Sequence, residues 1–231
     1  MLREALVFPR SDDDWLETVL IGGVLSLLGV LLVPAIFVNG YLLRVMGAAV
    51  RVEENAPRFE DWGDLFVDGL LVWVVELVYV GLPTVFLVFV VGSFTLVTSV
   101  SSSAGAGPTP WTTAGAGLVV AVVLLAVVGI LLLLAAFLLP AALANFARTG
   151  DVGAAFHLRT VAGAAFTGEY VIAVLLAIGV SVVLGLVGSV LSVMVVGFFV
   201  LFYLQVVVYH LFGQGFAAGL GVEADGNDAA G

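Results

Sequence analysis

An apolar stretch of about 44 residues, 169–212, is the feature that most limits what this chain can fold into. About 20 apolar residues suffice for a helix to cross the hydrocarbon core of a bilayer, so this stretch is too long for a single crossing. Two crossings need a tight turn between them, which we expect near 192–197. We therefore expect two membrane helices, 169–191 and 195–213, joined there by a tight turn.

The rest of the chain repeats this pattern. Hydrophobic residues make up 62% and charged residues 10%, whereas soluble domains are nearer 45–50% and 25%. Further apolar runs predict membrane helices at 15–33, 34–50, 65–97 and 118–139. Between them we expect an uncharged, flexible loop at 98–117, a polar connector at 140–167, and a disordered acidic tail at 223–231. The predicted fold is all-α: a polytopic transmembrane helical bundle in one integral domain, 1–222.

The position of Pro34 leaves two topologies open. If Pro34 bends one long helix, the chain crosses five times; if it marks the apex of a helical hairpin, the chain crosses six times. Short cytoplasmic loops carry the excess of basic residues, and six crossings place every arginine on one face, whereas five crossings separate two from the rest. We prefer six crossings, with both termini cytoplasmic and the protein in the cell (plasma) membrane. The arginines are Arg3, Arg10, Arg44, Arg51, Arg58, Arg148 and Arg159.

Charge and cysteine content exclude several classes of function. The chain has 17 acidic and 7 basic residues, a net charge of −10, which argues against nucleic acid as a partner. No cysteine is present, so thiolate catalysis and Cys-based metal sites are excluded, and His157 and His210 lack metal-ligand spacing. We expect no cofactor and no enzymatic activity, because no catalytic constellation is found. The expected partners are the lipid bilayer and either a second copy of the chain or another membrane protein.

Glu76 is the sharpest candidate for a functional group, since a carboxylate well inside a membrane helix is costly. It continues an acidic stripe that would guide a cation or a proton; its members are Asp61, Asp64, Asp68 and Glu76. The alternative is a solvated helix start, with Glu76 protonated or paired with Arg44 on the adjacent helix. The candidate intramembrane polar residues are Glu76, Arg44 and Asn39.

Small residues recur every four positions in the predicted helix 169–191. At this spacing they let helix backbones approach closely, which drives association within lipid. They predict a helix-packing seam, either inside one molecule or between two. The seam consists of Ala173, Ala177, Ser181, Gly185 and Ser189.

Several motifs resemble an uncharacterised archaeal family of multi-pass membrane proteins, of the kind found in halophiles and known only as a domain of unknown function. The matching segments are 13–16 (DDWL), 40–44 (GYLLR), 59–69 (FEDWGDLFVDG), 145–148 (NFAR) and 212–215 (FGQG). The resemblance implies a membrane class and a source but no mechanism. Two hypotheses of function remain: a structural or interaction membrane protein, or a small transporter or channel with a polar path near Glu76.

Overall fold

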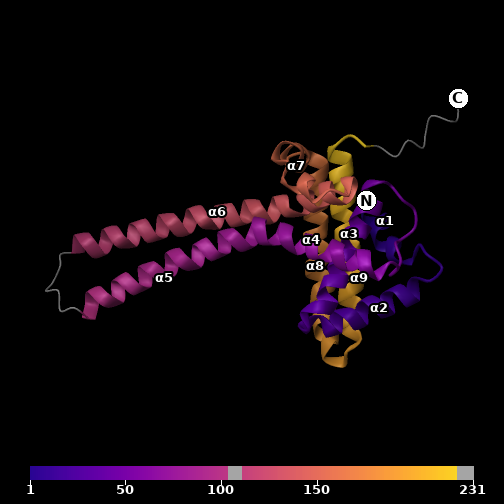
Figure 1. Ribbon diagram of the computed structural model, residues 1–231, viewed down its shortest axis with the longest axis horizontal. Coiled ribbons are helices and arrows are strands. Elements are labelled where there is room, and N and C mark those ends of the chain that lie inside the picture. The colour runs from indigo at the N-terminus through magenta and orange to yellow at the C-terminus, as the bar shows by residue number, and fades with distance from the viewer. Residues whose placement is uncertain (104–110, 223–231) are drawn as a thin grey trace. The chain divides into compact units, whose positions relative to one another are not determined.

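The computed structural model describes residues 1–103 and 111–222, and the regular elements in these ranges are all helices (Figure 1). They form two units, Met1–Val75 with Leu138–Gly231, and Glu76–Phe137. In the described ranges, five helices are long and apolar enough to cross a membrane, and Trp15–Leu27 is a shorter apolar helix. The all-helical membrane class is therefore confirmed, and the prediction of about six crossings is close. The five are Leu32–Val50, Trp62–Ser93, Val119–Thr149, Gly168–Met194 and Val196–Gly219.

Helix α9 (Val196–Gly219) lies at the centre of the first unit, where it packs against α8 (Gly168–Leu191), α3 (Leu32–Val50) and α2 (Trp15–Leu27). Glycines permit these close approaches. Gly22 of α2 lies directly against the Phe202 ring, and a Cβ added at Gly213 would lie 2.6 Å from the Met46 carbonyl oxygen. Helices α3 and α9 are consequently the most buried of the membrane-length helices, while α8 exposes an apolar outer face.

An aromatic cluster joins α3, α9 and the connector that follows α3. Tyr41 stacks on Phe59 with ring centroids 4.3 Å apart, and both rings contact Phe202. Tyr41 and Phe202 are fully buried. Aromatic pairs of this kind are worth about 0.5–1.5 kcal/mol each beyond area burial, so the cluster stabilises the packing of α3 and the connector against α9.

The break between α2 and α3 falls before Pro34. A short 3-10 turn, η2 (Leu28–Val30), follows α2, and Leu31 is extended with φ −85° and ψ 97°. Pro34 sits in the first turn of α3, where its missing N–H would have no intrahelical partner anyway. The predicted start of this helix at Pro34 is therefore two residues late, and Pro34 is not itself the apex.

The hairpin interpretation of α2 and α3 is supported by contacts between their far ends. The amide of Ala56, beyond α3, donates to the Ser11 hydroxyl at 2.8 Å, and Arg58 pairs with Asp12 before α2. A single bent helix would place these residues on opposite sides of a bilayer. The two helices instead bring Ala56 and Arg58 back beside Ser11 and Asp12.

The predicted helix 65–97 has three parts in the structure. Helix α4 (Trp62–Glu76) leads into a π-helical turn, η3 (Leu77–Gly81), and then into α5 (Leu82–Ser103). Pro83 lies in the first turn of α5. Proline has no N–H to donate, and the wider π-helical turn before it accommodates the missing backbone hydrogen bond. The predicted effect of Pro83, a local distortion without an end to the membrane segment, fits this arrangement.

Helix α6 (Trp111–Thr149) corrects two predictions. It continues through Pro140, so the prediction of a connector beginning there is wrong. Alanines after the proline favour helix and are buried, and the helix ends only before Gly150, whose φ of +71° is typical of a helix C-terminus. The predicted loop 98–117 is helical up to Ser103 and from Trp111; the remainder lies outside the described residues.

The last part of the chain follows the prediction more closely. Short helices η4 (Val152–Phe156) and α7 (Leu158–Ala165) precede α8, and a 3-10 turn, η5 (Ser192–Met194), joins α8 to α9. The predicted turn near 192–197 is thus confirmed. Helix α9 runs six residues beyond its predicted end, because Gly215 and Gly219 pack against α8 and the Ala164 carbonyl oxygen. The predicted disordered tail, 223–231, lies outside the described residues.

Candidate functional site

The N-terminal segment, which consists of α1 (Leu2–Val7) and η1 (Phe8–Arg10), packs along α9. Helix α1 and the 3-10 turn η1 bring Phe8 onto His210, with ring centroids 3.9 Å apart. Nearer the N-terminus of α1, the Glu4 carboxylate accepts a hydrogen bond of 3.0 Å from the Gln214 amide. The Tyr203 hydroxyl donates to the Leu6 carbonyl oxygen. These contacts, from Tyr203 to Gln214, hold α1 along α9.

The connector after α3 closes over this segment. The Ser11 hydroxyl accepts from the Ala56 amide and donates to the Phe8 carbonyl oxygen at 2.7 Å. Arg58 donates two hydrogen bonds of 2.8 Å to Asp12 and pairs with Asp14 at 2.7 Å. The guanidinium hydrogen bond lowers the pKa of the Asp12 carboxyl below its usual value, so the pair stays ionised at neutral pH.

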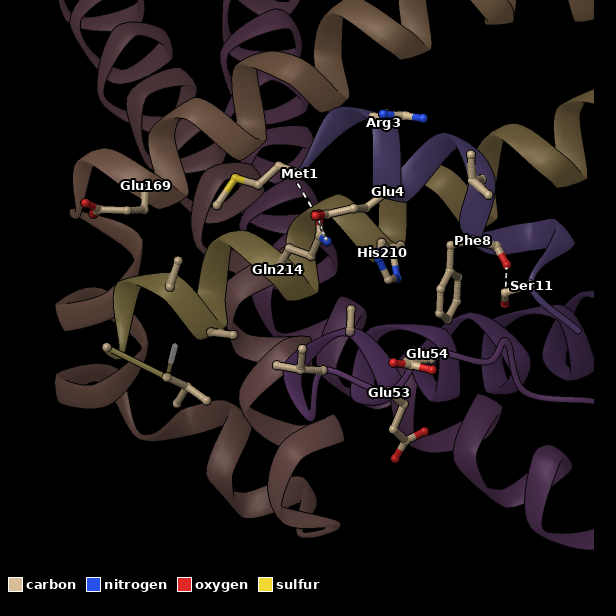
Figure 2. A pocket seen from close by; sticks show the side chains of 17 residues that line it. Met1, Arg3, Glu4, Phe8, Ser11, Glu53, Glu54, Glu169, His210 and Gln214 are labelled. Atoms are coloured by element: carbon tan, nitrogen blue, oxygen red, sulfur yellow. Dashed lines mark hydrogen bonds and ion pairs between the residues drawn. The ribbon is translucent and has the colours of Figure 1, made fainter. Parts of the chain in front are cut away.

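A cavity of about 980 Å³ lies between α1, this connector, the start of α8 and the end of α9 (Figure 2). All of its lining belongs to the first unit. Its volume is at the upper end of the range typical of small-molecule sites, about 300–1,000 Å³. The lining polar residues are Arg3, Glu4, Ser11, Glu53, Glu54, Glu169, His210 and Gln214.

The lining of the cavity is acidic. Four glutamates line it against one arginine and the amino group of Met1. Arg51, which follows α3, pairs with Glu53 at 2.6 Å, whereas Glu54 and Glu169 have no ion-pair partner within the described ranges. The hydrogen bond from the Met1 amino group, followed by that from Gln214, lowers the pKa of the Glu4 carboxyl. The lining therefore carries a net negative charge at neutral pH.

Two buried polar groups on α9 face the cavity without partners. His210 is only 5% exposed, and its Nδ1 makes no hydrogen bond to any described residue. Gln214 places its Nε2 on Glu4, and its Oε1 is buried and unpaired within the same ranges. Figure 2 shows both side chains beside Glu4 and Phe8. Since buried polar groups are nearly always hydrogen-bonded, these two atoms mark a place for a polar ligand.

The predicted polar residues do not converge on this cavity. Arg44 pairs with Asp68 at 3.4 Å and donates to the Glu60 carbonyl oxygen at 3.0 Å, both within the first unit, and its suggested pairing with Glu76 stays a prediction. Asn39 is partly buried in α3, and Glu76 ends α4 directly before the π-helical turn. Of the acidic stripe, Asp68 is the member that pairs with Arg44 in the described ranges.

The predicted seam is buried in its first half. Ala173 and Ala177 lie on α9 at 0% and 1% exposure, Gly185 is partly buried, and Ser181 and Ser189 are exposed. A strict four-residue repeat turns by about 40° per step around a helix of 3.6 residues per turn, so its later members leave the contact face. The contact continues instead through Gly188, which lies against Leu201.

Sequence reasoning missed the cavity residues, His210 among them. The available signal was the spacing of His210 and Gln214, two polar residues four positions apart and so on one face of an apolar helix. As for metals, no three His, Asp or Glu side chains of residues 1–103 and 111–222 gather closely enough to hold an ion.

Comparison with known proteins gives a family but no activity. The family described as "Protein of unknown function (DUF4013)" matches residues 27–193, well over half of the chain. No curated protein and no solved structure matches. The resemblance to a domain of unknown function is thus confirmed, and the archaeal, halophile-type source stays a prediction.

Proposed function

The chain belongs to the DUF4013 family of proteins of unknown function, and from this premise we propose that it is a multi-pass membrane protein that acts by binding. Its ligand is a small molecule or headgroup held in the cavity beside α9. The observation that carries this proposal is the coincidence of a roomy cavity with two buried, unpaired polar atoms, on His210 and Gln214. Ligand sites typically combine apolar walls with a few converging polar groups of this kind.

The surroundings support an interaction role in the membrane. The spans Trp62–Ser93, Val119–Thr149 and Gly168–Met194 bury 11%, 6% and 17% of their most apolar windows, so their faces are available to lipid or to other membrane helices, a second copy included. By the arginine asymmetry, the cavity opens on the cytoplasmic side of the plasma membrane. Arg3, Arg51 and Arg58 all belong to its lining or to the connector beside it.

Filling the cavity tests the binding role. Ala218 lines the cavity and is partly exposed, so Ala218→Trp should occupy the space without unpacking α9. Three five-carbon probes of different charge are offered: cadaverine, 1,5-pentanediol and glutarate. A ligand at a hundred times its Kd stabilises by about 2.7 kcal/mol, which raises Tm by roughly 5 to 10 °C in a chain of this size.

We expect at least one probe to raise the Tm of the detergent-purified protein, and Ala218→Trp to abolish that rise. Ala162→Trp is the matched control, because Ala162 is also partly exposed but lies on α7 away from the cavity. Val7→Trp on α1 fills the cavity from the other side and replaces Ala218→Trp if that variant does not fold. A rise that survives both cavity-filling variants would contradict the proposal, as would no rise with any probe.

A small transporter or channel is the second candidate, favoured by the π-helical turn η3 directly after Glu76. Such turns interrupt α-helices frequently at functional sites, and here one adjoins a carboxylate inside a membrane-length helix. The test is proton flux into liposomes containing the protein and a pH-sensitive dye. Transport predicts flux above that of protein-free liposomes and its loss in Glu76→Gln; equal flux in the two proteins would reject a path through Glu76.

A further inference from the structure

The unpaired atoms in the cavity are hydrogen-bond acceptors. An ionised carboxylate only accepts, so the amide group of Gln214 must turn its Nε2 toward Glu4 and its Oε1 away from it. Oε1 is therefore an acceptor with no donor among the described residues. The His210 Nδ1 accepts in the same way when the ring proton is on Nε2. In that tautomer, a ligand that satisfies both atoms has to donate hydrogen bonds.

The charges of the lining indicate which kind of hydrogen-bond donor the ligand carries. Glu4 lies beside Gln214 and His210, and Glu54 and Glu169 line the cavity without ion-pair partners in the described chain. An anion would meet this net negative lining unfavourably, and a neutral donor would leave the carboxylates without a counter-charge. A cation with N–H groups satisfies the acceptors and the carboxylates together.

The remaining walls are apolar. Val7, Phe8, Ala217 and Ala218 line the cavity, and Phe8 is held in place by its stack on His210. Burial of a ligand's hydrocarbon portion against them contributes about 25 cal/mol for each Å² removed from water. The walls thus accommodate an apolar body next to the charged group.

We propose that the cavity binds a primary ammonium group carried on an apolar body, with Gln214 Oε1 and His210 Nδ1 as acceptors and the glutamates as counter-charges. This inference rests on the proposed binding function and names its ligand class. Two sources supply that chemistry: a free alkylamine, or the headgroup of an aminophospholipid such as phosphatidylethanolamine. The quaternary trimethylammonium group has the charge but no N–H donor.

The experiment compares cadaverine with its bis-trimethylammonium analogue, 1,5-pentanediol and glutarate by calorimetric titration of the protein in phosphatidylcholine nanodiscs. We expect cadaverine to bind most tightly, with the trimethylated analogue at least about tenfold weaker, because hydrogen bonds to charged groups are worth a factor of ten or more. Tighter binding of the diol or glutarate would overturn the ammonium assignment while leaving the binding function intact. Binding of none of the four would overturn both.

Substitutions on α9 locate the acceptor. Gln214→Met keeps the side-chain length and removes the amide, so it should weaken cadaverine about tenfold. Gln205→Met is the matched control, because Gln205 is exposed on the same helix and does not line the cavity. Equal losses in the two variants, or no loss in Gln214→Met, would overturn the role of Gln214.

A second arm separates the two sources. Nanodiscs that contain phosphatidylethanolamine in place of part of the phosphatidylcholine present the same primary ammonium on a lipid. If the lipid headgroup is the ligand, phosphatidylethanolamine should compete with cadaverine, and native mass spectrometry should show it retained by the wild type and lost in Gln214→Met. If cadaverine binds with unchanged affinity, the ligand is a free amine.

Discussion

Gly69→Ala should unfold or severely destabilise the first unit, by at least about 3 kcal/mol, although it adds only one methyl group. Helices α3 and α4 cross backbone to backbone at Gly40 and Gly69. A Cβ at Gly69 would overlap the Ile36 carbonyl oxygen, and a Cβ at Gly40 would overlap that of Leu65. Overpacking a core costs about 1–3 kcal/mol where side chains can adjust, and here the obstructing atoms are backbone on both sides.

The control for this variant lies in the same helix. A Cβ added at Gly63 meets nothing within 4 Å, so Gly63→Ala should be neutral or stabilising by up to about 1 kcal/mol, because alanine favours helix over glycine. Thermal unfolding in detergent and size-exclusion chromatography measure both variants. Equal Tm values for Gly69→Ala and the wild type would show that α3 and α4 do not cross as described.

The same crossing supports the polar contacts beside it. Arg44, one turn after Gly40, reaches Asp68 and the Glu60 carbonyl oxygen across the two helices. The connector from 51 to 61 starts at the end of α3 and returns to α4, and it carries Glu53 and Glu54 into the cavity lining. A disturbed crossing would therefore also disturb the cavity, which makes Gly69 a residue on which the site depends without touching it.

Membrane class and the approximate number of crossings follow directly from the sequence, because apolar length is a local property of the chain. The turn between α8 and α9 was located for the same reason. Prolines were harder to interpret: Pro34 lies just inside a helix start and Pro140 lies within α6. Whether a proline ends a membrane helix depends on whether neighbouring groups satisfy the freed carbonyl, and that depends on tertiary packing.

The C-terminal end of α9 shows the same limit. Its glycines weaken helix propensity, yet Gly213, Gly215 and Gly219 each lie against atoms of other helices. Close packing there extends the helix past its predicted end. A period of exactly four in α8 was also misleading, since the contact face follows 3.6 residues per turn and leaves Ser189 exposed.

The cavity could not be predicted because its residues come from four distant parts of the chain, represented by Glu4, Glu53, Glu169 and Gln214. None of them stands out in the local sequence, because each glutamate lies in a segment typical of a solvent-exposed helix end or connector. Only their assembly around His210 makes the site. The arginine count, by contrast, gave the hairpin of α2 and α3, because topology depends on charges that can be read one by one.

The cavity exists only if the hairpin of α2 and α3 returns the connector to the N-terminal segment. A disulfide between Ser11→Cys and Ala56→Cys tests it, and the chain has no other cysteine. The Ser11 hydroxyl oxygen lies 2.8 Å from the Ala56 amide nitrogen, which limits the Cα separation to about 7 Å, near the disulfide range.

Oxidation of the double variant in native membranes, followed by mass spectrometry of the linked peptides, is the most direct measurement. The hairpin predicts that most chains form the disulfide between positions 11 and 56, while a control pair, Ser11→Cys with Ser192→Cys in η5, forms none. If α2 and α3 were one bent crossing, positions 11 and 56 would stand about 30 Å apart across the bilayer. Absence of the crosslink between positions 11 and 56 from a folded protein would contradict the hairpin of α2 and α3.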